Sequence, residues 1–368
     1  MSSKRIQDFL HNHTMPAAPE LVVRVDDDTV RCLACGNRCF IPNGESGICR
    51  MRFNHNGELR VPGGYVAGLQ IDPIEKKPFF HAFPGREALS FGMVGCNLHC
   101  SFCQNWVSSQ TLKDDFAGVM PHPVTADDLI AAALSEKAPV IVSTYNEPLI
   151  TSDWAVEIFK RAKPKGLVCG YVSNGNATPE VLKFLRPYVD LFKVDLKCFD
   201  EAKYRELGAN LHNILKSIEL LKDLGFWVEI VTLVVPEFNN SPEELAAIAK
   251  FIASISPDIP WHVTAFHPDY KMNNVRRTSR EDLDRAYDAG KTAGLHFVYE
   301  GNLAAGDREN TYCPSCGSLL IRRRGFYVLE NRMRGKHCPE CNALIAGMWE
   351  ENPPKQSGGI GIPRVLGI

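Results

Sequence analysis

Several features that assign a chain to a common class of protein are missing from these 368 residues. No uninterrupted apolar run approaches the roughly 20 residues of a membrane-spanning helix. Charge of neither sign dominates, and a formal net charge of −2 argues against a nucleic-acid binder that depends on phosphate contacts. The start, MSSKRIQDFLHNH, shows no apolar core or small-residue cleavage site of a secretory signal. We therefore expect neither a membrane nor a nucleic acid as a partner.

Two common enzyme signatures are also missing. The chain has neither the glycine fingerprint of dinucleotide binding nor a nucleophile elbow, so dehydrogenase and hydrolase functions find no support.

Cysteine, by contrast, is abundant. The 13 cysteines of a chain without a recognisable secretory signal indicate metal ligands in a reducing compartment, the cytoplasm, rather than disulfides. Eleven fall into three clusters, and we expect the other two, Cys169 and Cys198, to be core thiols.

The densest cluster lies in GCNLHCSFCQNW, where three and then two residues separate Cys96, Cys100 and Cys103. Three thiolates can hold three irons of a cubane iron–sulfur cluster and leave the fourth iron open, which makes a reaction centre. Phe102 adds an aromatic face against such a cluster. A zinc knuckle is the alternative, but zinc usually takes a fourth thiolate or imidazole. The nearest candidate, His99, lies between two of the proposed ligands.

A second cluster lies near the N-terminus, in CLACGNRCFIPNGESGIC, and consists of Cys32, Cys35, Cys39 and Cys49. Four thiolates close a coordination shell, so this site is expected to be structural or to pass electrons. The spacing matches neither a standard zinc ribbon nor a bacterial ferredoxin run. Zinc and an auxiliary iron–sulfur cluster therefore both stay open as interpretations, with a metal-free site as the third.

The third cluster consists of two C-x-x-C knuckles about twenty residues apart, Cys313 with Cys316 and Cys338 with Cys341. Between the knuckles, residues 319–321 and 326–329 are predicted to form a hairpin that turns at Gly325. Paired knuckles of this kind are typical of a zinc ribbon with a closed tetrahedral site, and iron in a rubredoxin-like site or a cluster is the alternative. We expect the basic run at 322–324 to lie on a solvated hairpin edge.

Short β-branched apolar runs alternate with amphipathic segments through the middle of the chain. Strands are predicted over residues 89–94, 140–144, 167–173, 191–196, 228–235, 262–266 and 296–299. Helices are predicted over residues 126–135, 153–162, 179–185, 213–224, 242–255 and 280–293, with Thr125 and Ser241 as N-caps. Repeated strand–helix units predict a parallel sheet with right-handed crossovers. The expected fold class is α/β, with a partial (β/α)6-type barrel short of the full eight units.

The length predicts two or three folding units and ample core. We expect an N-terminal Cys-rich metal-binding module over residues 1–60, the core barrel over 61–301 and a zinc-ribbon-like module over 302–350. A flexible tail rich in glycine and proline is expected over 351–368.

Polar residues follow four of the predicted strands, at the rim where reactive residues of such barrels lie. These segments are Tyr145-Asn146-Glu147-Pro148, Ser173-Asn174-Gly175-Asn176, Asp195-Leu196-Lys197 and Phe266-His267-Pro268-Asp269. A single polar strand end is usually a cap or turn, but four on the rim that also carries the cysteine triplet favour a binding site.

The triplet, YNEP, SNG, DLK and FHPDY resemble the glycyl-radical-activase (pyruvate formate-lyase activating) branch of the radical S-adenosylmethionine (SAM) superfamily. The head CLACGNRCFIPNGESGIC, the segment DPIEKKPFFHAFPG and the tail TYCPSCGSLLIRRRGFYVLENR are similar, more narrowly, to the radical SAM member of the AmmeMemoRadiSam system. The resemblance covers nearly the whole chain. One departure is that many superfamily members have two glycines before the glutamate, where this chain has Tyr145 and Asn146.

The resemblance implies that Cys96, Cys100 and Cys103 bind a 4Fe–4S cluster whose open iron takes the amino and carboxylate groups of SAM. It also implies a set of SAM-holding residues: Asn146 and Glu147 at the methionyl amino group, Ser173 and Asn174 along the methionine or ribose, Asp195 and Lys197 at the carboxylate or ribose, and His267 near the sugar. We expect these side chains to hold the ligand rather than to act as general acids or bases.

The implied reaction is reductive cleavage of SAM to methionine and a 5′-deoxyadenosyl radical, which abstracts hydrogen from a protein or peptide. The implied partners are a low-potential donor such as flavodoxin or ferredoxin, and Memo-type and AMMECR-type proteins. An activase that installs a glycyl radical on a separate enzyme is the alternative. A non-catalytic metal-binding or electron-transfer scaffold is the alternative from a different class.

Overall fold

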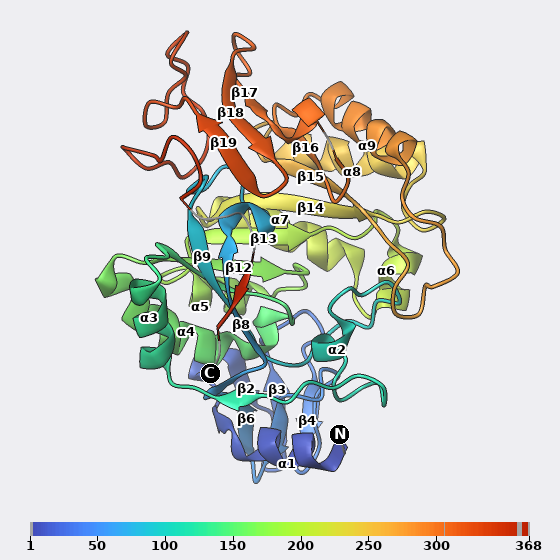
Figure 1. Ribbon diagram of the computed structural model, residues 1–368. Helices are drawn as coiled ribbons and strands as arrows, with labels where there is room; N and C mark the ends of the chain where they lie inside the picture. Colours follow the sequence, from blue (N-terminus) through green and yellow to red (C-terminus); the bar gives the residue numbers. More distant parts are fainter. Residues whose placement is uncertain (1–2, 305, 359–362, 367–368) are drawn as a thin grey trace.

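The alternation of strands and helices produces one twisted sheet of nine strands in the order β16-β15-β14-β13-β12-β11-β9-β8-β20 (Figure 1). The computed structural model describes residues 3–304, 306–358 and 363–366. Seven neighbouring strands are parallel: β9 (Glu87–Gly92), β11 (Val140–Ser143), β12 (Val168–Ser173), β13 (Leu191–Asp195), β14 (Trp227–Val234), β15 (Trp261–Ala265) and β16 (Val298–Gly301). The seven predicted strands are confirmed, with ends that differ by two residues or fewer.

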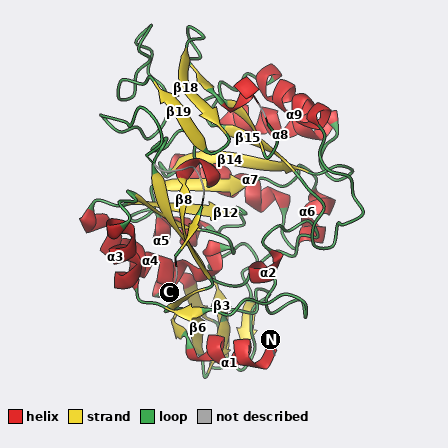
Figure 2. Ribbon diagram, viewed as in Figure 1, coloured by secondary structure: helices red, strands yellow, loops and turns green. Residues whose placement is uncertain are grey.

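Helices follow the first six of these strands, which confirms the α/β class with six strand–helix units and a seventh strand (Figure 2). The helices are α3 (Ala126–Ser135), α4 (Ser152–Ala162), α5 (Pro179–Leu185), α6 (Glu201–Leu207), α7 (Leu211–Asp223), α8 (Pro242–Ile255) and α9 (Arg280–Thr292). The hydroxyls of Thr125 and Ser241 accept hydrogen bonds from Asp128 N and Glu244 N, so both predicted N-caps are present. Helix α6 was not predicted, although Asp200 caps its start and the left-handed Gly208 ends it.

Two further strands extend the sheet beyond β9 and were not predicted. Strand β8 (Gly68–Pro73) pairs antiparallel with β9, and β20 (Arg364–Val365) pairs antiparallel with β8. Within the segment expected to be a flexible tail, Arg364 and Val365 thus pair with β8, and Arg364 also forms an ion pair with Glu87. Residues 359–362 and 367–368 of that tail lie outside the described residues.

The head consists mainly of short strands beneath the barrel in the view of Figure 1. One small sheet contains β1 (Thr14–Pro16), β6 (Glu58–Pro62) and β5 (Phe53–His55), another contains β2 (Val22–Arg24), β3 (Thr29–Cys32) and β4 (Phe40–Pro42), and β7 (Tyr65–Val66) pairs with β10 (His122–Pro123). Helix α1 (Ser3–Asn12) precedes them, and α2 (Trp106–Ser109) follows the cysteine triplet. The buried Arg52 ties the head to α4 through Asp153 at 2.5 Å.

The tail forms the predicted hairpin, β18 (Leu319–Arg324) and β19 (Tyr327–Asn331), which turns at Gly325, and β17 (Thr311–Tyr312) adds a third strand. The expectation of a solvated basic run is wrong for Arg323. Its side chain is buried, lies over the ring of Phe80 and donates hydrogen bonds to Phe80 O and Thr311 Oγ1. The tail is thus anchored to the barrel by a buried guanidinium.

Five 3-10 helices complete the described elements: Pro19–Leu21, Ile74–Lys76, Pro148–Thr151, Lys163–Lys165 and Gly306–Glu309. Within the described residues, no helix combines the length and apolar character that crossing a membrane requires.

Candidate active site

A cavity of about 1170 Å³ runs along the inner face of the sheet. Alternate residues of β13, β14 and β15 line it, as expected for side chains on one face of a sheet: Lys193 and Asp195, Val231 and Leu233, His262 and Thr264. The three triplet cysteines also line it, and so do residues of the tail hairpin. The cavity therefore joins the proposed cluster site to the tail hairpin.

The triplet lies in the loop after β9, where the barrel rule predicted it. Cys100 is buried, and Cys96 and Cys103 are half-buried. Several contacts shape the loop: Lys113 Nζ donates to Cys96 O at 2.6 Å, Leu98 N donates to Cys96 Sγ at 3.3 Å, and Cys103 Sγ lies 3.3 Å from Ser109 Oγ. All three thiols thus face one cavity from a loop that its own hydrogen bonds hold.

The spacing of the triplet thiols matches a cluster better than a single ion. In the described part of the chain, one group of cysteine, histidine or acidic side chains brings all its ligand atoms within 4.8 Å of one another, and the triplet is not that group. Ligands of one ion must converge, whereas each thiolate of a cubane binds a different iron and lies farther from its neighbours. The donor set therefore fits a 4Fe–4S cluster with an open iron. The buried ring of Phe102 lines the same cavity and packs against Phe238.

Glu147 is the centre of a buried hydrogen-bond network. Its Oε1 accepts from Ser173 Oγ at 2.7 Å and from Leu149 N at 3.1 Å, while its Oε2 accepts from Asn174 N at 2.8 Å. Burial raises the pKa of Glu147 to about 7, although the hydrogen bonds from Asn174 and Ser173 partly lower it. The structure thus brings three predicted site residues from two strand ends into direct contact.

Asn146 and Tyr145 precede this glutamate in an unusual backbone conformation. Tyr145 has a φ of 71°, in the left-handed region that favours glycine. This is one of the two positions where the resemblance expects glycine, so the backbone keeps a glycine-like shape despite the different side chain. Asn146 lines the cavity, but its Oδ1 already accepts a hydrogen bond from Met93 N at 2.9 Å. The amide therefore orients the loop after β9.

Asn174 connects the end of β12 to the triplet loop. Its Nδ2 donates to Asn97 Oδ1 at 2.7 Å and lies 3.8 Å from Cys96 Sγ. Asn97, which the sequence did not single out, is fully buried beside the first cysteine. A predicted SAM-holding residue and a predicted cluster ligand are therefore neighbours.

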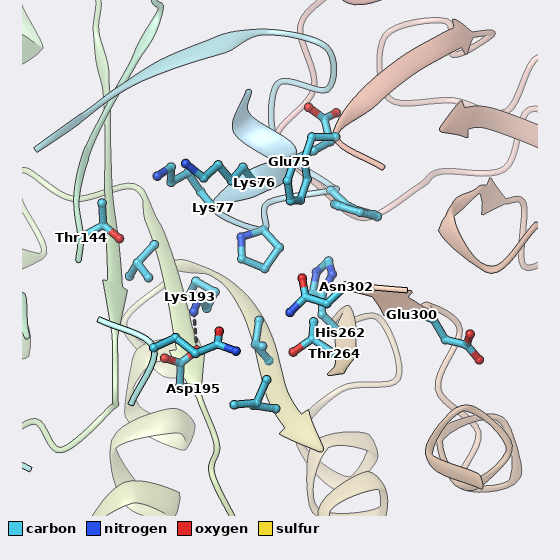
Figure 3. A pocket seen from close by; sticks show the side chains of 18 of the residues that line it. Glu75, Lys76, Lys77, Thr144, Lys193, Asp195, His262, Thr264, Glu300 and Asn302 are labelled. Carbon is cyan, nitrogen blue, oxygen red and sulfur yellow. Dashed lines mark hydrogen bonds and ion pairs between the residues drawn. The ribbon is translucent and has the colours of Figure 1, made fainter. Parts of the chain in front are cut away.

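Asp195 lies at the end of β13, and Figure 3 shows Lys193 beside it. Lys193 hydrogen-bonds Asp195 Oδ1, and Lys197 Nζ lies 3.6 Å from Oδ2. Burial alone raises the pKa of Asp195, but the charges of Lys193 and Lys197 lower it by more, so the pKa lies below its usual value. The group stays an anion that presents fixed charge to the cavity. Lys193, which the sequence did not single out, is itself buried.

His267 is the predicted site residue that the structure leaves outside the cavity lining. Its side chain is 53% exposed, and its Nδ1 lies 3.0 Å from Gln104 Nε2. Gln104 itself lines the cavity next to Cys103. His267 thus contacts the rim only through another side chain.

The structure adds a polar group that the sequence reasoning missed. Tyr145 donates to Asp72 Oδ2 at 2.6 Å, and Lys77 forms an ion pair with the same carboxylate. Burial lowers the pKa of Lys77 to about 8, against the opposite effect of Asp72. In the sequence, the run IEKK between two prolines could have indicated this group. A run of charges alone, however, is more often a solvent-exposed face. In Figure 3, Lys76 and Lys77 lie across the cavity from His262 and Thr264.

The two four-cysteine sets differ in geometry. The tail set is the compact group of the described residues, with all ligand atoms within 4.8 Å and sulfur–sulfur distances of 3.6 Å for Cys313 with Cys341 and 3.7 Å for Cys316 with Cys338. This arrangement suits one tetrahedral ion. The head set, Cys32, Cys35, Cys39 and Cys49, gathers in the head without forming such a compact group.

The topology and the site together define a class of protein. The sequence profile of the Radical SAM superfamily matches residues 91–252, which contain the triplet, the Glu147 network and Asp195. The chain belongs to the radical SAM superfamily and is an enzyme of that type. Membership implies a 4Fe–4S cluster and SAM as cofactors.

Relatives narrow the class further. An uncharacterized protein of Methanocaldococcus jannaschii is 36% identical over 326 residues, 88% of this chain and 96% of the relative. A putative glycyl-radical enzyme activating enzyme of the same organism is 31% identical over 178 residues, 46% of this chain and 70% of the relative. The pyruvate formate-lyase-activating enzyme of Staphylococcus epidermidis is 27% identical over 232 residues, 55% of this chain and 88% of the relative. The chain is thus homologous to glycyl-radical-enzyme activating enzymes.

Proposed function

We propose that this enzyme cleaves SAM reductively at a cluster held by Cys96, Cys100 and Cys103 and that the resulting radical abstracts hydrogen from a protein or peptide. The observation that carries the proposal is the single cavity, which the triplet thiols and the Glu147 network both line. When bound, the cluster and SAM together supply methionine and the 5′-deoxyadenosyl radical. The protein supplies position and the exclusion of water.

The residues of the chain have separate holding roles in this proposal. The carboxylate of Glu147 accepts the methionyl ammonium, with Asn146 shaping the backbone beside it. Ser173 and Asn174 lie along the methionine, and both already hydrogen-bond Glu147. Because these side chains are fixed by one another before SAM arrives, little ordering is lost on binding.

Further holding roles belong to the other side of the cavity. Asp195 and Lys197 place the carboxylate or ribose, and Phe102 covers the cluster. His267 acts near the sugar only if the rim closes around Gln104, to which it is hydrogen-bonded.

The size of the cavity supports a substrate larger than SAM alone. Pockets for a single small ligand usually measure about 300–1,000 Å³, and this one measures about 1170 Å³. The remainder extends to the tail hairpin, where Arg322, Arg324 and Phe326 line it. A side chain or short segment of a second protein fits that position.

The narrower assignment is the radical SAM member of the AmmeMemoRadiSam system. The head, the DPIEKKPFF segment and the tail support it by their resemblance to that member, and residues of the latter two segments also line the cavity. Memo-type and AMMECR-type proteins are then the proposed substrate partners. A flavodoxin or ferredoxin is the proposed electron donor, in the cytoplasm, where the thiols stay reduced.

The proposed domains are the head over 1–60, the core over 61–301, the zinc-ribbon-like module over 302–350 and the terminal segment over 351–368. Zinc in the tail site is supported by four thiols in a compact set. Its proposed role is structural, since it holds the base of a hairpin that lines the cavity.

A second candidate function is activation of a partner enzyme by a glycyl radical, which the homology to activating enzymes favours. Two samples of each partner, one deuterated at glycine Cα and one deuterated at every residue except glycine, separate the two functions when incubated with reduced enzyme and SAM. Deuterium that reaches 5′-deoxyadenosine from the glycine-labelled sample would support the activase, and deuterium from the other sample of the Memo-type or AMMECR-type partner would support the first proposal.

The non-catalytic scaffold is tested by anaerobic reconstitution, reduction and assay of 5′-deoxyadenosine. We expect the product from the wild type and from Cys169→Ala, which removes a buried thiol outside the three cysteine sets. A variant with alanine at all three triplet positions is expected to form none. Wild-type protein with an intact cluster and no product would contradict the enzyme proposal.

A further inference from the structure

We propose that the four head cysteines hold an iron–sulfur cluster rather than zinc, and that this second cluster exchanges electrons directly with the triplet cluster. The electron-transfer part rests on the proposed function of the triplet. The identity of the head metal does not rest on that function, because it follows from the geometry of the head itself.

Among the described residues, the head thiols do not form a set compact enough for a single ion. Cys32 interacts electrostatically with the other three, Cys35, Cys39 and Cys49. In a tetrahedral zinc site with Zn–S bonds of about 2.3 Å, sulfurs lie roughly 3.8 Å apart. The tail thiols have that spacing, at 3.6 and 3.7 Å, whereas the head thiols form no comparable group among the described residues. Within the described chain, the triplet likewise forms no such compact group, so the two sets of thiols are alike in their wider spacing.

A buried arginine indicates that the head site carries negative charge. Arg52 is 1% exposed, and its Nε and Nη2 have no hydrogen-bond partner among the described residues. Its third guanidinium nitrogen, Nη1, donates hydrogen bonds to Asp153 and to Ile150 O. The guanidinium also interacts with Cys32, Cys39 and Cys49. Unpaired buried donors are costly, and thiolates with bridging sulfides would accept their hydrogen bonds.

One asparagine connects the head site to the triplet. Asn97 follows Cys96, accepts a hydrogen bond from Asn174 at its Oδ1 and accepts another, from Asn37 of the head, at its backbone oxygen at 3.4 Å. Its Nδ2 is buried without a close hydrogen-bond partner in the described chain and interacts with the thiol of Cys35. A single side chain therefore separates a head ligand from a triplet ligand.

A second contact joins the two loops. Gly95, which precedes Cys96, has a φ of +94°, and a Cβ there would lie 3.0 Å from the sulfur of Met51, two residues after Cys49. Lys113 binds the backbone of the triplet loop and interacts electrostatically with both Cys96 and Cys49. The loop that carries Cys49 thus lies against the loop that carries Cys96.

Electron tunnelling falls steeply with distance, so two centres separated by one side chain exchange electrons directly. A reduced one-electron carrier gives one electron to the head cluster and is itself oxidised. The head cluster passes that electron to the triplet cluster and returns to its oxidised state. The head also reaches the surface, since Cys39 is half-buried and the adjacent Phe40 is 60% exposed. The triplet cluster therefore needs no exposed surface of its own to receive electrons.

Metal counts test the head site by itself. After anaerobic reconstitution of a variant with alanine at Cys96, Cys100 and Cys103, we expect one zinc and equal amounts of iron and sulfide, about two or four of each per chain. The reciprocal variant, Cys32→Ala with Cys39→Ala, should lose this iron and keep the triplet's. Two zinc and no iron in the triplet variant would overturn the proposal. If either variant does not fold, wild-type protein with two zinc and only about four iron would overturn it equally.

Spectroscopy tests the contact between the clusters. We expect the electron paramagnetic resonance spectrum of fully reduced wild type to show spin–spin broadening that is missing from the summed spectra of the two variants. We also expect reduced flavodoxin to reduce the triplet cluster at least tenfold more slowly in the head variant than in the wild type. Dithionite should reduce the triplet cluster at the same rate in both proteins. An additive spectrum with unchanged flavodoxin rates would overturn electron exchange. Loss of SAM cleavage with both clusters present would instead contradict the proposed function of the triplet.

Discussion

The side-chain amide of Asn174 donates a hydrogen bond to Asn97 Oδ1 at 2.7 Å, while the backbone N–H of the same residue binds Glu147 at 2.8 Å. One residue at the end of β12 therefore holds both the loop of the triplet and the carboxylate proposed to bind SAM. Because both contacts are buried, the triplet loop and the Glu147 carboxylate are held in a fixed relation to each other.

Replacing Glu147 by glutamine tests the ligand-holding role. The change keeps the size of the side chain and removes its charge, so the methionyl ammonium loses an ionic hydrogen bond that contributes about 1.5–3 kcal/mol. SAM affinity should fall roughly 10- to 100-fold, measured by anaerobic calorimetry, with iron content unchanged. Glu147→Ala should lose activity as well, and normal turnover in that variant would refute the assignment.

The pKa of Glu147 predicts how stability depends on pH. Burial raises the pKa from 4.5 to about 7, so the folded state binds this proton more tightly than the unfolded state. The stabilisation is fully present below pH 4.5 and is lost as pH rises through about 7. Without SAM, the free energy of unfolding of wild type relative to Glu147→Gln should fall by about 3 kcal/mol over this range, measured by urea titration. A difference in unfolding free energy that does not change with pH would contradict the raised pKa of Glu147.

Gly92 makes room for the left-handed Tyr145. A Cβ at position 92 would lie 2.7 Å from Thr144 O and 2.9 Å from Tyr145 Cβ. Gly92→Ala should therefore cost about 1–3 kcal/mol of stability and weaken SAM binding by displacing the loop that carries Glu147. Gly170→Ala is the matched control in a neighbouring strand, since its Cβ would meet Val142 at an ordinary 3.4 Å. Equal effects of the two substitutions would contradict this role.

Arg323 should be the residue on which docking of the tail depends. Its guanidinium lies 3.7 Å from the buried carboxylate of Glu75, which Arg323→Ala would leave unpaired, at a cost of about 3–5 kcal/mol. Arg322→Ala, one residue away and half exposed, should cost less than about 1 kcal/mol. Adding Glu75→Gln to Arg323→Ala should recover part of the loss in thermal unfolding. No recovery would mean that packing on Phe80, and not charge, dominates.

Removal of the zinc proposed for the tail site should loosen one wall of the cavity. Cys338→Ser should lower the zinc content by one per chain and lower the unfolding temperature, because the knuckles close the base of the hairpin. Cys198→Ser, at a buried thiol outside the cysteine sets, should leave zinc unchanged. SAM affinity should survive in both variants, since the Glu147 network lies on the strand ends. Zinc retained in Cys338→Ser would contradict the assigned ligand set.

Local patterns were sufficient to predict much of the barrel. Apolar runs such as 140–144 are buried along their whole length, and hydroxyls such as that of Thr125 cap helices through neighbours three residues away. These signals depend on residues close in sequence. Helix α6 was missed, although α5 has the same length of seven residues and was predicted.

Contacts over long sequence separations account for what was missed. Arg323 is buried because Phe80, 243 residues earlier, packs beneath it, and no local pattern distinguishes it from Arg322. Strand β20 forms because Arg364 and Val365 find the free edge of β8. The Asp72, Lys77 and Tyr145 group depends in the same way on the pairing of β8 with β9.

The sequence by itself determined the class of enzyme, because cysteine spacing and strand-end motifs are local and chemically specific. It also determined where the barrel strands lie along the chain, because apolar periodicity and capping act over a few residues. Only the tertiary structure decided that Glu147, Ser173 and Asn174 form one network and that His267 lies outside the cavity. It alone placed a tail arginine in the core and brought Asn37 of the head against the backbone of Asn97, next to Cys96. Those relations depend on how distant segments pack, which spacing along the chain does not encode.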